Sequence, residues 1–351
     1  MKLRKHSSTY SPFRALSLFA AAVLSTLVGS ANATGPNTKT LRQLDTPAPY
    51  SFWKGIQSPQ NTDIASDPAR AFATGDDSYR LGDEWGKKTV TDEVLRQASV
   101  AFRRAALATA RTGGATGFYL GKFGNTHVMA TNHHVFPNAW NCLNRNVRFP
   151  FLNREFKCVA YFGTWPEIDL SLFAIEVTRA EDERLLAEVA GNFSFQTELT
   201  PGQELLTIGF GVAHNPNRLL VANQDSDCKV FSNRGEYRLM ADPDEYNPGS
   251  YRAWSFANGC DVSHGDSGSA MVDRQTGRVV GIIWTGRIPK SADAQSSATL
   301  GQWLNTGAPQ IWTELSYAVP ASKIGEVLRR VADAVSTPEG TREVLNRLLA
   351  Q

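Results

Sequence analysis

Beyond its first residues, the 351-residue chain has no apolar run long enough to cross a bilayer, few cysteines and no cluster of basic residues. The cysteines show neither a C-x-x-C spacing nor a grouping with histidine, so no zinc site is indicated. There is no internal repeat and no low-complexity tract. Helical and strand-like segments do not alternate regularly, as a parallel sheet would require. These absences argue against a membrane protein, a zinc protein and a parallel α/β fold.

Residues 1–33 have the composition of a secretory signal peptide. The leader carries four cations and no acidic residue, namely Lys2, Arg4, Lys5 and Arg14. The apolar run over 15–28 is shorter than the roughly 20 residues that a membrane span needs. Ala31-Asn32-Ala33 fits the small-residue cleavage pattern, and the alternative is a retained anchor. We expect cleavage after Ala33 and a secreted or periplasmic protein.

Removal of this leader changes the charge balance. The full chain has 36 basic and 34 acidic residues, and loss of the four leader cations leaves 32 against 34. A near-neutral chain without a basic cluster gives no reason to expect nucleic acid as a partner. No membrane association is expected after cleavage of the leader.

The four cysteines, Cys142, Cys158, Cys228 and Cys260, suggest disulfides, because their number is even and the chain is expected to be exported. Three pairings are possible. We favour Cys142–Cys158 with Cys228–Cys260, since each pair flanks loops between strand-like segments. The alternative is buried free thiols.

The residues after the leader lack sustained periodicity. The segment 34–88 is rich in Pro, Thr, Asp, Asn and Gly, and Trp53 and Trp85 could anchor it to a folded domain. Thr91 can cap a helix that continues to about residue 105, with acidic residues in its first turn and an apolar side. We therefore expect an N-terminal arm or pro-segment over 34–105.

Short strand-like runs then dominate the chain, punctuated by Gly, Asn, Asp and Pro. They cover 115–120, 127–131, 156–162, 170–177, 204–210, 219–222, 269–272 and 279–284. Gly124-Asn125 fits a hairpin turn between the first two. Helices are expected over 181–189, 322–335 and 341–349. So many short strands indicate a mainly β fold of barrels or sandwiches.

Three short motifs carry residues suited to catalysis. They are Ala130-Thr131-Asn132-His133-His134-Val135, Ile168-Asp169-Leu170-Ser171-Leu172 and His264-Gly265-Asp266-Ser267-Gly268-Ser269-Ala270. A serine hydroxyl needs a base to become a nucleophile, and nearby donors must hold the oxyanion that it creates. The glycines around Ser267 would let the amides of Gly265 and Ser267 point the same way. His134 could act as the base and Asp169 could fix its tautomer.

The order His, Asp, Ser and these motifs resemble the trypsin/chymotrypsin-like serine peptidases. T-N-H-H-V is similar to their T-A-A-H-C and T-N-x-H-V signatures, D-L-S-L to D-I-A-L, and G-D-S-G to their nucleophile loop. The segment 281–286 is similar to the strand that follows that loop. Cys260-Asp261 looks closer to the bacterial trypsin-like and glutamyl-endopeptidase-like members. The resemblance covers 113–331, about three fifths of the chain.

The resemblance implies two six-stranded antiparallel β-barrels with the active site between them and a C-terminal helix. We assign 106–335 to this peptidase domain and 336–351 to a further helix. The resemblance makes His134 the general base, Asp169 its orienting carboxylate and Ser267 the nucleophile, with Gly265 and Ser267 supplying the oxyanion hole. Ser269 and Ala270 depart from the commoner G-D-S-G-G-P, although related bacterial members also carry Ser at the first of these positions.

The residues that set specificity are less well marked. Asp261, Trp284 and Gly286 are candidates for substrate binding, and Asp261 stands where trypsin keeps the acid that binds Arg or Lys. Asp266 either pairs with a new N-terminus made by cleavage or bonds locally to its turn. Lys87-Lys88 and Arg103-Arg104 are conceivable processing sites, but neither precedes Ile-Val-Gly-Gly.

These observations predict a secreted, monomeric serine endopeptidase that cleaves proteins or peptides through an acyl-enzyme, with no metal and no cofactor. One alternative is a catalytically silent binding protein on the same fold. Another is a triad hydrolase acting on esters. Ser269 breaks the G-x-S-x-G elbow of α/β-hydrolases, and the triad order also differs from theirs.

Overall fold

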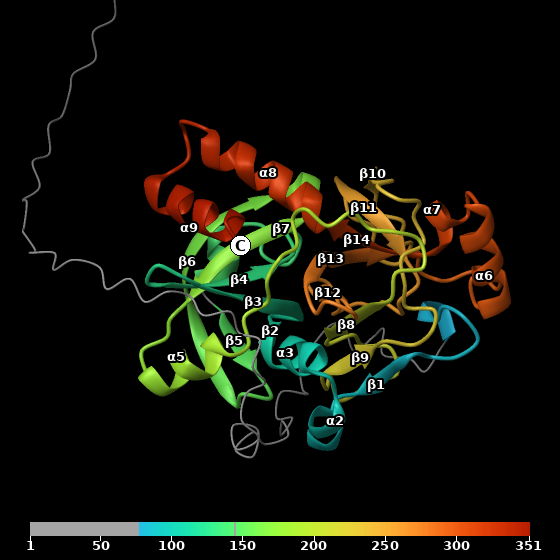
Figure 1. Ribbon diagram of the computed structural model, residues 1–351, viewed down its shortest axis with the longest axis horizontal. Coiled ribbons are helices and arrows are strands. Elements are labelled where there is room, and N and C mark those ends of the chain that lie inside the picture. Colours follow the sequence, from blue (N-terminus) through green and yellow to red (C-terminus); the bar gives the residue numbers. More distant parts are fainter. Residues whose placement is uncertain (1–76, 144) are drawn as a thin grey trace, which may run out of the picture. The chain divides into compact units, whose positions relative to one another are not determined.

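The computed structural model describes residues 77–143 and 145–351 (Figure 1). All of them belong to one compact unit of the chain, Pro47–Gln351. The expected signal peptide over 1–33, Trp53 and the first part of the expected N-terminal arm lie outside the described residues. For those segments the sequence prediction stays a prediction.

The described residues form short antiparallel strands with a few helices between and after them (Figure 1). The strands are β1 (Lys87–Thr89), β2 (Thr109–Thr112), β3 (Ala115–Phe123), β4 (Thr126–Thr131), β5 (Asn146–Phe149), β6 (Arg154–Trp165), β7 (Leu170–Ile175), β8 (Leu205–Gly209), β9 (Val221–Asn223), β10 (Arg238–Ala241), β11 (Arg252–Asn258), β12 (Ala270–Asp273), β13 (Val279–Gly286) and β14 (Ser316–Pro320). The helices are η2 (Asp77–Tyr79), α2 (Asp92–Gln97), α3 (Val100–Ala108), α4 (Ala139–Leu143), η3 (Pro166–Ile168), α5 (Ala180–Ala187), α6 (Ser297–Thr306), α7 (Ile311–Glu314), α8 (Ala321–Asp333) and α9 (Glu339–Leu349).

The first half of the described chain makes a closed barrel in the order β2-β3-β4-β7-β6-β5, which includes the green strands of Figure 1. β4 and β7 are antiparallel neighbours, with Thr131 opposite Ser171. The residues that follow β4 and those that precede β7 therefore emerge at the same end of the barrel. This register brings His134 and Asp169 together although they lie in separate motifs.

The strands of the second half, together with β1, make an eight-stranded sheet in the order β1-β9-β8-β12-β13-β14-β11-β10. Two isolated bridges, Glu204 with Lys229 and Val230 with Asn258, connect the β8 side of this sheet back to β11. The sheet thus curls into a second barrel around its own apolar cluster, which includes Leu205, Val230, Phe256, Met271 and Ile283. The expected mainly β class is confirmed.

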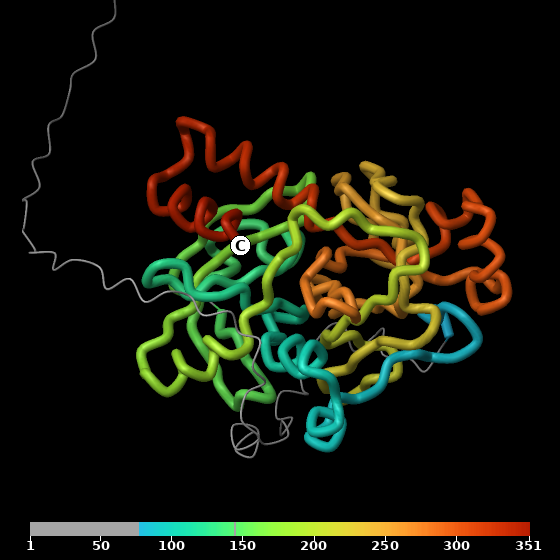
Figure 2. Tube along the Cα trace, viewed as in Figure 1, coloured from blue at the N-terminus to red at the C-terminus, as the bar shows by residue number. Residues whose placement is uncertain are grey.

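The described end of the N-terminal arm is part of this second sheet and does not form a separate segment. β1 pairs with β9, with Lys87 opposite Asn223. Figure 2 shows the residues around 77–90, in blue, running beside α6, where Asp83 and Ser297 exchange hydrogen bonds. The boundary that the sequence placed at residue 105 therefore does not mark the start of the folded barrels.

The helix expected over 91–105 is two helices. Thr91 caps α2 as predicted, with its side chain accepting from the Val94 N–H. The chain then becomes extended at Ala98, and the side chain of Ser99 accepts from the Phe102 N–H to start α3. A second N-cap residue inside the periodic run therefore divides it.

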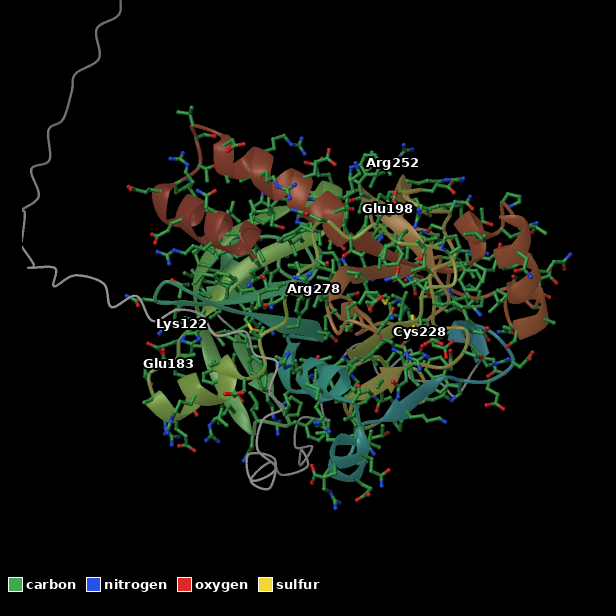
Figure 3. All side chains as sticks on the ribbon, viewed as in Figure 1. Lys122, Glu183, Glu198, Cys228, Arg252 and Arg278 are labelled. Carbon is green, nitrogen blue, oxygen red and sulfur yellow. A yellow bond between two sulfur atoms is a disulfide. The ribbon has the colours of Figure 1, made fainter. Side chains whose placement is uncertain are left out.

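Both disulfides form as favoured, Cys142 with Cys158 and Cys228 with Cys260. The first joins α4 to β6 of the first barrel. The second joins the segment before Lys229 to the residue after Gly259, close to the nucleophile motif; Figure 3 labels Cys228 beside its sulfur atoms.

Candidate active site

The loop that carries Ser267 runs from β11 to β12 and is held in a conformation that needs glycine. Gly265 has a φ of +93°, and a Cβ there would lie 2.5 Å from the Phe210 carbonyl oxygen. Gly268 has a φ of +87°. The loop is fixed to the first barrel at Thr116, whose N–H donates to the Ser267 carbonyl at 3.0 Å and whose hydroxyl donates to the Gly265 carbonyl at 2.7 Å.

The amides of Gly265 and Ser267 are available to a ligand. Neither N–H donates to an acceptor among the described residues, although the neighbouring amides do: Asp266 N–H donates to Ser263 at 3.0 Å and Gly268 N–H to Ile283 at 3.0 Å. Two unpaired donors on a rigid turn, two residues apart and beside a serine, are suited to hold an oxyanion.

His134 is oriented by Asp169. The imidazole Nδ1 lies 2.9 Å from Asp169 Oδ2, and the backbone N–H of His134 donates to Oδ1 at 3.1 Å. Asp169 is fully buried, follows η3 and has a left-handed backbone with φ of 36°. The Asn132 amide donates to its carbonyl at 2.8 Å, so the unusual backbone is held from the neighbouring motif.

A tyrosine that the sequence analysis did not single out completes this group. The Tyr251 hydroxyl donates to Asp169 Oδ1 at 2.7 Å and lies 3.0 Å from His134 Nδ1. Burial, together with the charge of Asp169, raises the pKa of the Tyr251 hydroxyl, so it stays protonated and acts as a donor. Tyr251 is placed by the loop between β10 and β11, in the second barrel.

The environment of His134 favours the protonated ring. Burial lowers the pKa of the imidazole, but the charge of Asp169 and its hydrogen bond raise it, and the charge of Asp242 adds to this effect. The net result is a His134 pKa above the ordinary value for an imidazole. The imidazole, 35% exposed, thus faces both a buried carboxylate and solvent.

His134 and Ser267 line one cavity of about 370 Å³. Its other lining residues are Asp242, Asp244, Asn247, Pro248, Gly249, Ser250, Tyr251, Val262, Ser263, His264, Trp284, Thr285, Gly286 and Ile288. The Ser267 hydroxyl makes no hydrogen bond to another described residue. Catalytic hydrogen bonds are often loose without substrate, and the shared cavity places the nucleophile and the base at one site.

A comparison with protein families gives a match over the part of the chain that carries these residues. Residues 115–282 match the model of the trypsin-like peptidase domain, and this span contains His134, Asp169 and Ser267. Over these residues the chain is similar to a trypsin-like peptidase domain. The match agrees with the serine protease type that the motifs predicted.

Solved structures that are similar to the chain are distant in sequence. An inactive form of Rv3671c from M. tuberculosis H37Rv is 16% identical, with 72% of this chain and 99% of that chain covered and a TM-score of 0.44. The active form of the Rv3671c protease is 17% identical, with 69% and 87% covered and a TM-score of 0.42. The HtrA-type protease AlgW with tripeptide is 17% identical, with 67% and 64% covered and a TM-score of 0.41. No curated protein sequence matches the chain.

Within the peptidase domain the two adjacent histidines have separate environments. His133 Nδ1 lies 2.7 Å from the Thr164 hydroxyl, on the first barrel, and its ring packs edge-to-face with Tyr251 at 5.2 Å. Burial lowers the pKa of His133, in contrast to that of His134. Its position agrees with the prediction that His134, the second histidine, is the base.

Asp261 does not lie in the cavity of the peptidase domain. It is 1% exposed, and its two carboxylate oxygens accept the backbone N–H groups of Leu81 at 2.7 Å and Gly86 at 2.6 Å. Burial raises its pKa to about 7, against the effect of these two donors. The sequence prediction that Asp261 binds substrate is corrected accordingly: its carboxylate is occupied by the N-terminal segment. Trp284 and Gly286, the other two candidates, do line the cavity.

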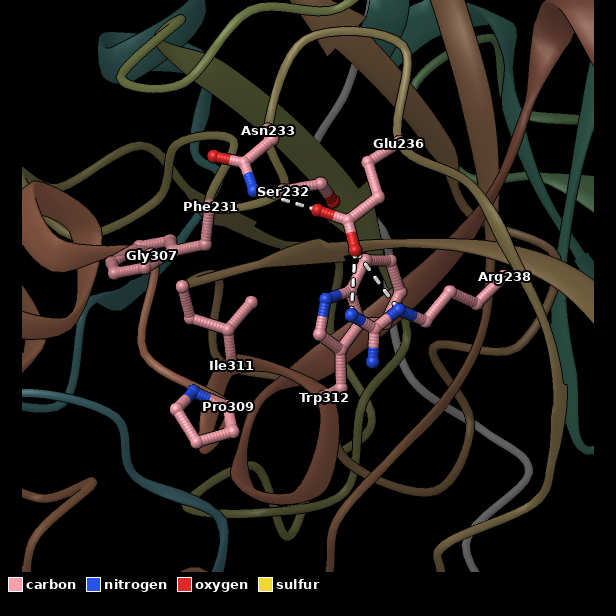
Figure 4. A pocket seen from close by; sticks show the side chains of 9 residues that line it. All are labelled: Phe231, Ser232, Asn233, Glu236, Arg238, Gly307, Pro309, Ile311 and Trp312. Atoms are coloured by element: carbon pink, nitrogen blue, oxygen red, sulfur yellow. Dashed lines mark hydrogen bonds and ion pairs between the residues drawn. The ribbon is translucent and has the colours of Figure 1, made fainter.

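A second cavity of the peptidase domain, about 150 Å³, lies between residues around β10 and α7 (Figure 4). Its two charged side chains, Glu236 and Arg238, are hydrogen-bonded to each other. Glu236 accepts from Arg238 at 2.6 Å and from Asn233 at 2.8 Å, and the Arg238 guanidinium lies 4.3 Å from the centre of the Trp312 ring. The Glu236 carboxylate is thus already paired with the guanidinium and the amide.

Among the described residues of the peptidase there is no cluster of His, Cys, Asp and Glu that could hold a metal ion. None of the helices in the described part of the chain is long and apolar enough to cross a membrane.

Proposed function

We propose that the protein is a serine endopeptidase in which Ser267 is the nucleophile, His134 the general base and Asp169 its orienting carboxylate. The observation that carries the proposal is the Asp169–His134 pair, bonded at 2.9 Å, on the wall of a cavity that Ser267 also lines. The base has a fixed orientation, and the hydroxyl and the oxyanion donors come from one turn, whose Ser267 lines the same cavity.

In this mechanism a substrate carbonyl carbon lies beside Ser267 Oγ. His134 Nε2 removes the hydroxyl proton as the C–O bond forms, and then gives that proton to the amine as the C–N bond breaks. Asp169 holds the Nδ1 proton and stabilises the imidazolium. Water, activated by the same ring, then releases the acyl group and regenerates Ser267.

The free amides of Gly265 and Ser267 hold the negative oxygen of each tetrahedral intermediate. Such preorganised donors typically contribute 10²–10³-fold to kcat. Tyr251 supports the charge separation from the other side, because its hydroxyl donates to the Asp169 oxygen that the His134 ring does not use.

The site of action is proposed to be outside the cytoplasm. The leader over 1–33 has signal-peptide composition, and the two disulfides suit an oxidising compartment. Detection of the mature N-terminus at Thr34 in a periplasmic or culture fraction tests this part of the proposal. Retention of the leader in a membrane fraction contradicts it.

The direct test is a cleavage profile on a peptide library, read by mass spectrometry, with wild type and Ser267→Ala side by side. Wild type should cut internal peptide bonds, and Ser267→Ala should lose nearly all of this activity while keeping its circular dichroism spectrum. Hydrolysis of small esters but of no peptide would favour an esterase. A folded wild type that acts on neither substrate would favour a silent binding protein.

A further inference from the structure

A buried ion pair lies directly beside the nucleophile. The Lys87 ammonium contacts Asp266 Oδ2, and the two side chains are only 2% and 1% exposed. Asp266 is the residue before Ser267 and the residue after Gly265, so it lies between the two amides of the oxyanion hole. Buried charges are costly unless paired, so removal of either partner alone would leave an uncompensated charge beside the nucleophile.

The Asp266 carboxylate ties the turn together. Its Oδ1 accepts the Gly211 N–H at 3.1 Å, and its Oδ2 accepts the Ser263 N–H at 2.8 Å. These bonds join the residues after β8 to the start of the turn that carries Ser267. The orientation of the Asp266 peptide, and with it that of the flanking amides, depends on where this carboxylate is held.

The cation that holds it comes from the N-terminal segment. Lys87 begins β1, which pairs with β9, and the residues just before it bind the same turn region through Asp261, which accepts from Leu81 and Gly86. The Tyr79 hydroxyl also lies 3.3 Å from His264 Nδ1. One continuous segment therefore contacts three positions immediately ahead of the nucleophile.

The next residue offers a contrast. Lys88 is exposed on the other face of β1, while Lys87 points into the protein. Surface pairs such as Lys122 with Glu183, labelled in Figure 3, are about 40% exposed and are expected to contribute little. Of these two adjacent lysines, Lys87 is the one whose ammonium contacts the nucleophile turn.

We propose that Lys87 is a positioning residue that holds the oxyanion hole in its working geometry through Asp266. This inference rests on the proposed peptidase function. Its consequence is that an ammonium from inside the chain supplies the partner of Asp266, so no new N-terminus is needed to make that ion pair. Cleavage after Lys87-Lys88, a conceivable processing site by sequence, would cut β1 itself between Lys88 and Thr89 and is expected to inactivate the protein.

The test compares Lys87→Met with Lys88→Met in the mature protein. Each variant is treated with a fluorophosphonate, and kcat and KM are measured on a small ester. We expect Lys87→Met to lose about 100-fold in kcat and in labelling rate, the size of loss seen when an oxyanion-hole donor is removed, with little change in KM. Lys88→Met should match wild type. Equal labelling rates and kcat for Lys87→Met and wild type would overturn the proposal.

A double variant separates positioning from folding. Lys87→Met leaves Asp266 buried without its cation and could prevent folding, whereas Lys87→Met with Asp266→Asn leaves no unpaired charge. We expect the double variant to melt cooperatively yet remain slow with the fluorophosphonate. A double variant as active as wild type would show that the pair is only structural. If the fluorophosphonate does not label wild type, the proposed function itself fails. If it labels wild type and the double variant at the same rate, only the positioning role of Lys87 fails.

Discussion

The buried carboxylate of Asp169 accepts from the His134 backbone, the His134 ring and Tyr251. Its left-handed backbone, held by Asn132, aims both oxygens at these donors. A single carboxylate thus fixes the ring tautomer, the ring orientation and the loop from the second barrel. Burial lowers the pKa of His134, and the charge and hydrogen bond of Asp169 are the main influences that raise it.

The pH dependence of activity should report the effect of Asp169 on the pKa of His134. The rate needs neutral His134, and its raised pKa places the acid limb of kcat/KM above the ordinary value of about 6.5, with activity rising as pH increases through it. Asp169→Asn should move the limb down and lower kcat, by a factor on the order of 10⁴ as in other triads of this type. The measurement is a pH–rate profile on a small ester.

Asp242→Asn is the matched control for that profile. Asp242 raises the pKa of His134 through its charge alone and makes no hydrogen bond to the ring. Its loss should therefore move the limb less than the loss of Asp169. Two results contradict the assignment of His134 as the general base. One is a wild-type profile whose acid limb has its midpoint at or below pH 6.5, and the other is a midpoint that Asp169→Asn leaves unchanged.

Tyr251→Phe should lower kcat by about tenfold or more. A hydrogen bond to a charged group contributes about 1.5–3 kcal/mol, and this one is made to Asp169 at 2.7 Å. KM for a small ester should change little, because the loss concerns the orientation of the base. Steady-state kinetics check this, with Tyr246→Phe, an exposed tyrosine of the same loop, as control. Equal kcat for Tyr251→Phe and wild type would show that this bond has no part in the reaction.

The catalytic candidates could be predicted from the sequence because each stands in a short motif with its own composition. Tyr251 could not, since it lies 82 residues from Asp169 in a polar loop with no periodic pattern. The same holds for Asp261: its neighbours in the chain suggested a specificity residue, but its partners Leu81 and Gly86 come from a segment 175 to 180 residues away. Local patterns do not reveal such contacts.

At the scale of elements, the strands with buried apolar runs were predicted well. β3, β4, β7 and β13 are buried along nearly their whole length. Two of the strands that were not predicted, β1 and β10, are short and largely exposed. The others, β2, β5, β11 and β14, are recognised as strands from their pairing with neighbouring strands. Helices α4, α6 and α7 were also missed. The hairpin turn at Gly124-Asn125 joins β3 to β4 as expected, with Gly124 at φ of 64°.

The two disulfides should differ in what their removal costs. Their loops close over 16 and 32 residues, which corresponds to about 3 and about 4 kcal/mol in a chain-entropy treatment. Replacing Cys142 and Cys158 by serine should lower Tm and leave kcat near wild type. Replacing Cys228 and Cys260 should lower both, because Cys260 precedes the buried Asp261 and the nucleophile turn. Thermal melts and ester kinetics on the two double variants check this; equal kcat would contradict the second part.

At the scale of the whole described chain, both ends bind the barrels. α8 contacts β13 and β14 of the second barrel and η3 beside Asp169, while α9 packs on α8 and on β3 of the first barrel. These helices were expected over 322–335 and 341–349, and they bury Leu328, Leu345 and Leu348. The N-terminal strand β1 could not be predicted, because Lys87-Lys88-Thr89 is polar.

The central claim is that residues from two barrels form one catalytic centre. The most direct measurement is to treat the mature protein with diisopropyl fluorophosphate, with trypsin as a positive control, and to locate the adduct by peptide mass mapping. The predicted result is one adduct per chain, on Ser267, whose formation slows as the pH falls below the His134 pKa. An adduct on another serine, or none on folded protein while trypsin reacts, would contradict it.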